Sequence, residues 1–354
     1  MNEWQQQKNQ RQVANWLLLG VAMIVIQVIL GGITRLTESG LSITEWKPIT
    51  GTLPPLNDAA WQVEFDKYRT TDQFKYVHQH FSLADFKFIF FWEWFHRVWA
   101  RLLCLVFLAG FVYFLVTKKF RKGMIMPLII LFLLGALQGA IGWIMVKSGL
   151  VPEKFYVGHI ELTTHFIAAM VLLCFTLWYA LQLLPAFREK VVSPPLRSML
   201  VTLLALLFAQ LMYGGFMAGL KAGASAPTWP LMNGEWYPVG MNDIEPGWQN
   251  LFRNNLAIQF IHRGLAYILL FSAFYFYTRS AVYKGNGLFN RFRTGFMVMI
   301  IIQVTLGILT VVNATVPSRL VWLGVMHQFT AMLLLIILVS MLYIVRRKTV
   351  QAAI

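Results

Sequence analysis

Long runs of apolar residues, separated by shorter polar segments, dominate the chain. Eight such runs occupy residues 16–34, 88–116, 124–146, 159–184, 199–220, 255–278, 295–313 and 322–345. A helix of about 20 residues crosses the roughly 30 Å hydrocarbon layer of a bilayer and satisfies its own backbone polar groups. We therefore predict an all-α polytopic membrane protein with eight transmembrane helices. The first run is too long for a secretory signal peptide and lacks a small-residue cleavage site.

Composition supports this prediction. Of 354 residues, 58% are hydrophobic and only 13% are charged, and the mean hydropathy is +0.60. Soluble chains average about 25% charged residues, so a disordered chain, a coiled coil and an ordinary soluble enzyme are excluded. Nevertheless the chain carries 30 basic against 15 acidic residues.

The position of these charges predicts the orientation of the helices. If the N-terminus is cytoplasmic, the inner segments carry a net charge of +14, the outer segments 0 and the spans +1. This distribution follows the positive-inside rule and places both termini in the cytoplasm. Because the basic residues lie on short loops and tails at one membrane face, we expect no nucleic-acid partner.

The two halves of the sequence repeat one four-helix unit. The matching segments are Gly31-Gly32 with Gly214-Gly215, EWFHR (93–97) with QFIHR (259–263), Gln138 and Gly142 with Gln303 and Gly307, and HFIAAM (165–170) with HQFTAM (327–332). Each unit has an even number of spans, so both enter the membrane in the same direction and are related by a pseudo-twofold axis along its normal. We predict two four-helix bundles, residues 1–190 and 191–354.

Four histidines lie within spans at a similar depth, two in each unit: His96, His165, His262 and His327. A porphyrin is flat and apolar, and its iron accepts one imidazole on each face, so each pair predicts a bis-histidine haem. A zinc site would need three or four ligands at each centre. The alternative for a single histidine is a hydrogen bond to a neighbouring helix.

An arginine follows the first histidine of each pair, Arg97 and Arg263. An intramembrane guanidinium needs an anionic partner, and the haem propionates would supply one. The alternatives are an ion pair with Glu93 or Glu161, or extension of the side chain to the membrane interface.

The repeats differ in their ionisable residues, which the first unit keeps and the second replaces: Glu93 by Gln259, Glu161 by Leu323, Arg101 by Tyr267 and Arg35 by Ala218. Glu93 and Glu161 share helical faces with His96 and His165. Burial would favour the neutral form of a membrane carboxylate, a candidate proton donor or acceptor, although pairing of Glu93 with Arg97 or Arg101 is the alternative. We predict that the first half reacts and the second holds a permanent cofactor.

The outer loops look structured. In the loop at 35–87, Trp61, Phe65 and Tyr68 fall on one face of a predicted helix lying along the membrane surface. For His78 and His80 in this loop, and for His159 at the edge of a span, we expect surface or interfacial positions. Cys104 and Cys174 lie in apolar runs and predict neither a disulfide nor a metal site.

Several motifs resemble those of the haem A synthase family, in its proteobacterial and mitochondrial-type branch: GGITRLTESGLS (31–42), TEWKP (44–48), EWFHR (93–97), APTWPLMNG (226–234) and HR (262–263). The resemblance extends over residues 13–345. It implies oxidation of the C8 methyl of haem O to a formyl group by successive hydroxylations. The absence of a transit peptide favours a multi-pass protein of a bacterial inner membrane.

The resemblance also implies site residues. His262 and His327 would ligate a haem b cofactor, with Arg263 beside them. His96 and His165 would flank the substrate haem O, with Arg97 and Arg35 as further substrate-binding residues, and Glu93 would take part in catalysis. Haem O synthase would supply the substrate. The electron acceptor and the oligomeric state, a homo-oligomer included, stay open.

Two other functions remain as alternatives from the residues alone. A dihaem b-type cytochrome that passes electrons between quinol and a partner would use the same histidine pairs, but it gives no reason for the one-sided Glu93, Glu161 and Arg35. A parallel-repeat transporter would use the histidines to bind protons or a metal.

Overall fold

The structure is a computed structural model that describes residues 3–45, 50–187 and 189–347. Within these residues, eight helices are long and apolar enough to cross a membrane. They are α1 (Glu3–Leu36), α4 (Leu83–Val116), α5 (Ile125–Gly149), α6 (His159–Leu183), α7 (Pro194–Leu220), α9 (Asn255–Arg279), α10 (Gly287–Val312) and α11 (Pro317–Ile344). The prediction of an all-α protein with eight spans is confirmed, and α1 begins well before its apolar run.

Short elements connect these helices. The α-helices are α2 (Asp58–Arg69), α3 (Asp72–Tyr76) and α8 (Asn250–Arg253), and the 3₁₀ turns are Thr50–Thr52, Pro185–Phe187, Ala222–Ser225, Gly247–Gln249 and Ser280–Tyr283. Strands β1 (Val191–Val192) and β2 (Val345–Arg346) pair in parallel. In the TEWKP motif, Trp46, Lys47 and Pro48 lie outside the described residues.

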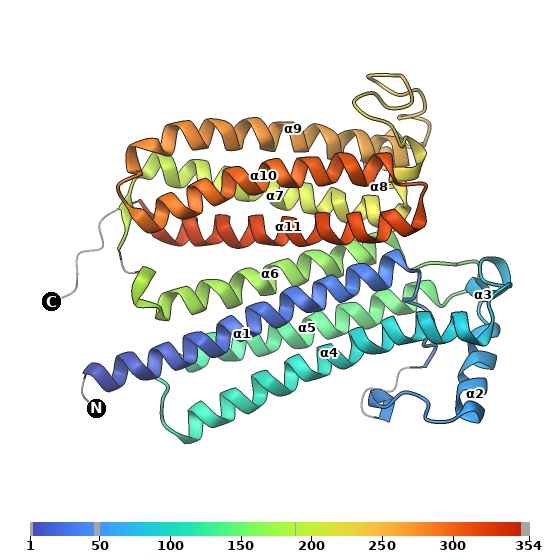
Figure 1. Cartoon of the computed structure of the whole chain (residues 1–354), viewed down its shortest axis with the longest axis horizontal. Coiled ribbons are helices and arrows are strands. Elements are labelled where there is room, and N and C mark those ends of the chain that lie inside the picture. Colours follow the sequence, from blue (N-terminus) through green and yellow to red (C-terminus); the bar gives the residue numbers. More distant parts are fainter. Residues whose placement is uncertain (1–2, 46–49, 188, 348–354) are drawn as a thin grey trace.

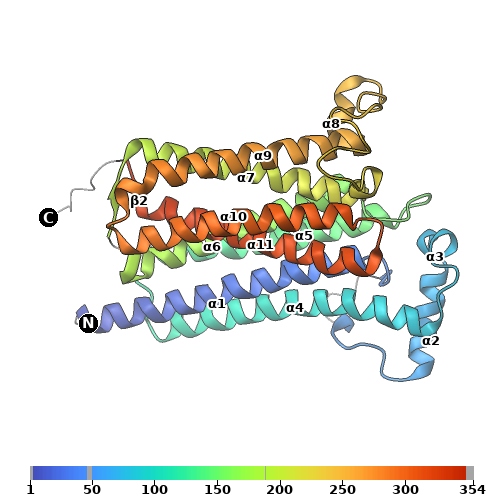
Figure 2. The same ribbon diagram turned by 45° about the horizontal axis from the view of Figure 1, so that its top comes forward.

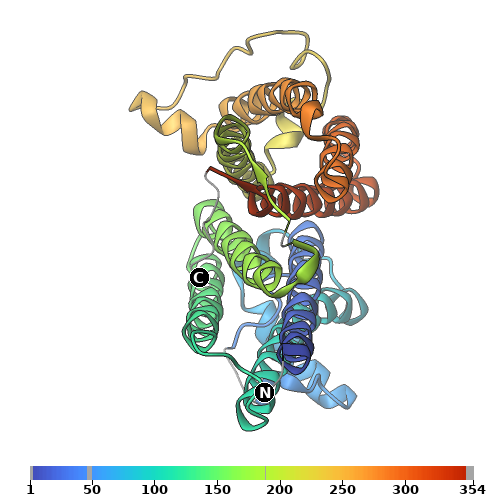
Figure 3. The same ribbon diagram turned by 90° about the vertical axis from the view of Figure 1, so that its left-hand side faces the viewer.

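The long helices form two groups of four, seen end-on in Figure 3. One group contains α1, α4, α5 and α6, and the other contains α7, α9, α10 and α11. The groups meet where α6 packs against α7 and α11, and where α1 packs against α11. Helix α1 begins and α11 ends at the same end of the molecule (Figure 1). Which end faces the cytoplasm, and which cofactor each half holds, stay predictions.

The hydrophobic core lies along this meeting surface. Leu17 of α1, Met170 of α6 and Leu335 of α11 are almost completely buried within one continuous cluster. By contrast, Leu105 of α4, Leu133 of α5 and Ile301 of α10 are exposed. Large apolar side chains on the exposed face of a helix are typical of a surface in contact with lipid.

Local sequence fixes where the functional helices begin. Ser82 caps α4 with a capping box, since its side chain bonds the backbone of Asp85 while the Asp85 carboxylate bonds the Ser82 backbone. Asn254 caps α9 by accepting from two backbone N–H groups. Side-chain caps of this kind typically contribute about 1 kcal/mol and set the start of a helix.

The first outer loop forms a small domain of its own beside α4 (Figure 2). The predicted helix is confirmed as α2, but its aromatic face does not lie along the membrane surface. Phe65 and Tyr68 are buried against Phe86 and Phe90 of α4, and the rings of Trp61 and Phe90 are 5.0 Å apart. The spacing of the aromatic residues therefore predicted a contact face of α2 correctly. The surface that covers this face is helix α4 of the same chain.

The surface position expected for His78 is wrong. His78 is 5% exposed, and its Nε2 lies 3.3 Å from the carboxylate of Glu38. Its Nδ1 lies 2.6 Å from the hydroxyl of Tyr68. The hydrogen bond from His78, with the ion pair from Lys221, lowers the pKa of Glu38 from 4.5 to about 2. His80 is exposed, as expected.

Candidate functional site

In the first bundle, each predicted histidine faces a glutamine and a glycine of a neighbouring helix. The Nε2 of Gln27 in α1 lies 3.2 Å from both ring nitrogens of His96 in α4. A Cβ at Gly31 would lie 3.2 Å from Cε1 of the same ring. His165 in α6 has the same arrangement with α5, where Gln138 lies 3.2 Å from its Nδ1 and a Cβ at Gly142 would lie 2.8 Å from its Cε1.

The second bundle repeats the arrangement. Gln210 of α7 lies 3.2 Å from Nε2 of His262, and a Cβ at Gly214 would lie 3.4 Å from its Cε1. Around His327 the glutamine is Gln303 of α10, 3.1 Å from Nδ1, and a Cβ at Gly307 would lie 3.0 Å from Cε1. Each imidazole therefore contacts an amide and a bare stretch of backbone that lie one turn apart on the same neighbouring helix.

The geometry of His262 and His327 fits a bis-imidazole iron. Their ring centroids are 6.4 Å apart and their planes differ by 73°. Two metal–nitrogen bonds of about 2 Å, plus the roughly 1.1 Å from each nitrogen to its ring centre, separate two axial imidazoles by about 6 Å. Nδ1 of His262 is buried without a hydrogen-bond partner. Among the described residues no three His, Cys, Asp or Glu side chains gather into a metal site of another type.

The double glycines of α1 and α7 serve two different contacts. The first glycine of each pair, Gly31 or Gly214, faces a histidine of its own bundle. The second faces the other bundle, because a Cβ at Gly32 would collide with Gln328 of α11 and one at Gly215 would lie 2.7 Å from Thr163 of α6. Two adjacent glycines are thus required where one helix contacts both a histidine of its own bundle and a helix of the other bundle.

Sequence reasoning found the glycines but missed two of the four glutamines, Gln27 and Gln210. The signal was present in the chain, since each lies four residues before the first glycine of its pair. The same spacing separates Gln138 from Gly142, which the repeat did reveal. A spacing of four places both residues on one face of a helix.

Glu93 lies one turn before His96 and has three donors. Its Oε2 accepts from the hydroxyl of Ser42 at 2.7 Å and from the backbone N–H of Ile43 at 2.9 Å. Its Oε1 forms an ion pair with Arg97 at 2.5 Å, and Glu93 is 2% exposed. The pairing of Glu93 with Arg97, which the sequence left open as an alternative, is therefore present.

The equivalent position in the second bundle reverses the direction of the hydrogen bonds. Gln259 donates to the backbone oxygen of Ala226 at 2.9 Å, and Arg263 donates to the same oxygen at 2.9 Å. In the second bundle the loop thus supplies carbonyl acceptors. In the first bundle the loop supplies a hydroxyl and a backbone N–H as donors to Glu93. Replacement of Glu by Gln is thus accompanied by replacement of loop donors by a loop acceptor.

Two other predicted residues make their contacts elsewhere in the structure. Arg35 donates to the backbone oxygens of Ala218 and Gly219, at 2.6 and 3.0 Å, and so joins α1 to the last turn of α7. Glu161 folds back against Gly158 at the start of α6. Of the charged residues predicted from the repeat, Glu93 and Arg97 are the two that the structure brings together beside His96.

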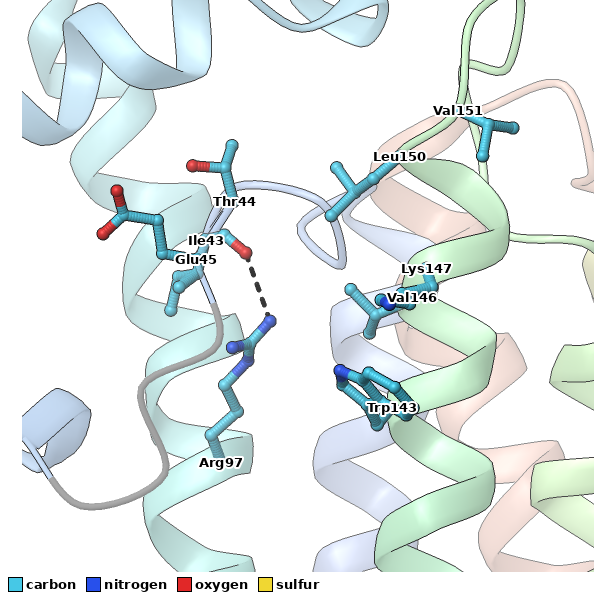
Figure 4. A pocket seen from close by; sticks show the side chains of 9 residues that line it. All are labelled: Ile43, Thr44, Glu45, Arg97, Trp143, Val146, Lys147, Leu150 and Val151. Carbon is cyan, nitrogen blue, oxygen red and sulfur yellow. Dashed lines mark hydrogen bonds between the residues drawn. The ribbon is translucent and has the colours of Figure 1, made fainter.

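A cavity of about 430 Å³ opens beside Arg97, between α4 and α5 (Figure 4). Ile43, Thr44 and Glu45 line one side, and Trp143, Val146 and Lys147 of α5 line the other. Arg97 donates to the backbone oxygen of Ile43 at 3.2 Å, so the loop and the guanidinium form one wall. Two cationic side chains, Arg97 and Lys147, thus border a largely apolar space.

The fold and these sites define a class: an eight-span membrane protein with two histidines inside each helix group, each against a glutamine and a glycine of a neighbouring helix. The family model described as "Cytochrome oxidase assembly protein" (COX15-CtaA) matches residues 14–339. Proteins named Heme A synthase are similar over nearly the whole length. The one from Flavobacterium psychrophilum is 40% identical over 93% of this chain and 96% of its own, and that from Paracoccus denitrificans is 42% identical over 90% and 85%. The chain belongs to the haem A synthase family.

Proposed function

We propose that this protein converts haem O to haem A by oxidising the C8 methyl group to a formyl group. Conversion of a methyl group to an aldehyde consumes one water and releases four electrons and four protons. The site must therefore accept protons, and an electron acceptor, not yet identified, must take the electrons. The supporting observation is Glu93, an ion-paired carboxylate held beside His96 in one bundle and replaced by Gln259 in the other.

In this proposal the first bundle binds the substrate. His96 and His165 flank the haem O plane. The cavity bordered by Arg97 and Lys147 is continuous with the wall that holds Glu93, so its cationic groups are suited to the propionates. The geometry favours Arg97 over Arg35 for this role, because Arg97 lines this cavity, whereas Arg35 donates to two carbonyls of α7.

Glu93 would receive protons released at the methyl carbon and stabilise positive charge that develops there. Ser42 and Ile43 fix one carboxylate oxygen and Arg97 fixes the other, so the group is oriented before the substrate arrives. Because the carboxylate is already oriented, little reorganisation energy is needed during the reaction. This preorganisation is the basis of electrostatic catalysis.

The second bundle would hold haem b through His262 and His327, with Arg263 near its propionates. The centroid separation of 6.4 Å fits this donor set. A haem with two protein ligands supplies one-electron transfer and has no open iron position. The chain's contribution is to hold the imidazoles and to keep the site covered by the loop at Ala226, to which Gln259 and Arg263 donate.

The charge distribution supports a bacterial inner-membrane location with both termini in the cytoplasm. The substrate would come from haem O synthase. In this orientation the cavity beside Arg97 lies near the outer face of the membrane.

Extraction of the pigments from purified protein tests the proposal. Haem B together with haem O, haem A or a hydroxylated intermediate supports the synthase. Two equivalents of haem B alone would identify a dihaem electron carrier instead, and a protein without any haem would overturn both.

A further inference from the structure

The two bundles differ in whether their four helices form a closed ring. In the second bundle α7 packs against α9, α9 against α10, α10 against α11 and α11 against α7. In the first bundle α4 packs against α1 and α5 against α6, but α4 and α5, both described over their whole lengths, make no comparable contact with one another. Because the halves meet through α1 and α6, the open side of the first bundle faces away from the second bundle, towards the lipid.

Two cavities lie along this open side. The outer one is the space of about 430 Å³ that Arg97 and Lys147 border (Figure 4). The deeper one, of about 470 Å³, is lined by Ala136, Gly139, Ala140 and Trp143 of α5. Trp143 borders both cavities, and Nζ of Lys147 lies 4.3 Å from the centre of its ring. The two spaces therefore follow one another along α5, with cationic groups at the outer end and an apolar wall further in.

The deeper cavity exists because α5 carries small side chains on this face. Its lining residues are spaced by three or four and so lie on one side of the helix, in line with Lys147. In the second unit, the register that pairs Gln138 with Gln303 places larger residues there: Ile301 for Ala136, Val304 for Gly139 and Thr305 for Ala140. Among the described residues, a Cβ added at Gly139 would meet nothing within 4 Å. No contact within the chain therefore explains why the first unit has a glycine at this position.

The chemistry of haem O matches this arrangement. Haem O is a haem B in which a hydroxylated isoprenoid chain replaces one vinyl group, on the far side of the porphyrin from the propionates. With the propionates beside Arg97 and Lys147, the chain would therefore lie further in. Ala136 lies about 16 Å along the helix from Lys147, at 1.5 Å per residue. Gly142, which contacts His165, lies between these two levels, so the porphyrin and the chain fall at matching depths.

We propose that the opening between α4 and α5 is the subsite for the isoprenoid chain of haem O. The inference rests on the proposed function and concerns the group that distinguishes the substrate from the cofactor. An apolar chain gains little by leaving lipid for an apolar protein surface, so the subsite acts by leaving room. The chain passes Ala136, Gly139 and Ala140 towards the bilayer while the porphyrin stays at the histidines. The closed ring of the second bundle suits a haem without such a chain.

Placing the second unit's side chains in the opening tests this. Ala136→Ile combined with Gly139→Val gives α5 the residues that α10 carries at the matching positions, so the helix should still form. The full-length protein, with haem B retained in the second bundle, is purified from cells that lack haem O synthase and titrated with haem O and with further haem B. We expect the Kd for haem O to rise about tenfold, because the added side chains overpack the space of the chain. The Kd for haem B at the first bundle should keep its wild-type value.

Gly139→Val alone provides a milder second variant in case the double variant loses the haem B of the second bundle. Its added side chain starts in open space, and we expect a smaller rise in the Kd for haem O. Leu137→Phe is the matched control, since it adds bulk to the same turn of α5 at a side chain that is 54% exposed and borders neither cavity. It should bind haem O as the wild type does.

The outcomes separate the two proposals. Wild-type protein that neither binds nor converts haem O would overturn the proposed function and this inference together. A wild-type Kd for haem O in both variants would overturn the subsite and leave the proposed function standing. An equal rise for haem O and haem B would also overturn it, because the added side chains would then act on the porphyrin and not on the chain. So would an equal rise in Leu137→Phe, because the effect would not be confined to the opening.

Discussion

Gln328 of α11 donates its Nε2 hydrogen to the backbone oxygen of Val28 in α1, at 2.9 Å. Gln328 follows His327 directly, and Val28 follows Gln27, which contacts His96. His327 and His96 are therefore connected through neighbouring residues of α11 and α1. The only step between the bundles in this connection is the hydrogen bond from Gln328 to Val28. The route exists only because Gly32 lets α11 approach α1, where any Cβ would collide with Gln328.

Substitution of Gly32 should consequently separate the bundles. Gly32→Val forces Gln328 away from Val28, and overpacking of this kind costs about 1–3 kcal/mol. We expect a lower thermal unfolding temperature in detergent and a weaker spectral coupling between the two haem sites. Gly135→Ala in α5 is the control, because nothing lies near its added Cβ. Equal unfolding temperatures for Gly32→Val and the wild type would show that this contact contributes nothing to stability.

The two histidine pairs should lose different pigments when they are mutated. His262→Ala removes one of the two imidazoles whose rings lie 6.4 Å apart, so haem B content should fall roughly tenfold or more. His96→Ala should leave haem B in place and abolish the conversion of haem O. Chromatography of extracted pigments distinguishes the two results, and loss of haem B from His96→Ala alone would reverse the assignment of the halves.

Glu93 and Glu161 provide a comparison between two carboxylates that the repeat singles out equally. Glu93 is held by three donors beside His96, whereas Glu161 folds against Gly158. We expect Glu93→Gln to lower haem O conversion by about 100-fold or more, the range typical of a lost general acid or base. Glu161→Gln should keep most of the activity. Pigment conversion in membranes measures both, and full activity in Glu93→Gln would remove that residue from the chemistry.

The spans and the histidine pairs could be predicted from the sequence because they depend on composition and spacing. Apolar length alone determines whether a helix can cross a bilayer, and the repeat places His96 opposite His262 in the register. The double glycines were visible for the same reason. The different contacts of the two glycines could not be predicted from the sequence. Gly31 faces a histidine of its own bundle, whereas Gly32 faces Gln328, about 300 residues away in the chain.

Contacts made by loops were beyond sequence reasoning. Ser42 and the backbone of Ile43 reach Glu93 only because the segment after α1 folds over the first bundle. His78 was expected at the surface because loop histidines usually lie there, yet it is buried against Tyr68. Periodicity identified the aromatic face of α2 but carried no information on whether lipid or α4 covers it.

Glu38 should make the stability of the outer loops depend on pH. His78 bonds its carboxylate, Lys221 forms an ion pair with it, and the hydroxyl of Tyr156 lies 3.5 Å away. The hydrogen bond from His78 and the interaction with Lys221 lower the pKa of Glu38 from 4.5 to about 2 in the folded protein. A carboxyl whose folded pKa is depressed stabilises the fold above its unfolded pKa, and that contribution disappears as pH falls from 4.5 towards 2.

Thermal unfolding of the wild type and Glu38→Gln between pH 7 and pH 3 measures this contribution. We expect the wild type to unfold a few degrees higher at pH 7 and the gap to narrow progressively below about pH 4.5, because the carboxyl of the unfolded chain takes up a proton there while that of the folded protein stays ionised until the pH approaches 2. Glu153→Gln, at an exposed loop carboxylate, should show no gap at either pH. A difference in unfolding temperature that does not change with pH would mean that Glu38 acts through packing. No difference at pH 7 would mean that the ion pair between Glu38 and Lys221 does not stabilise the contact between the halves.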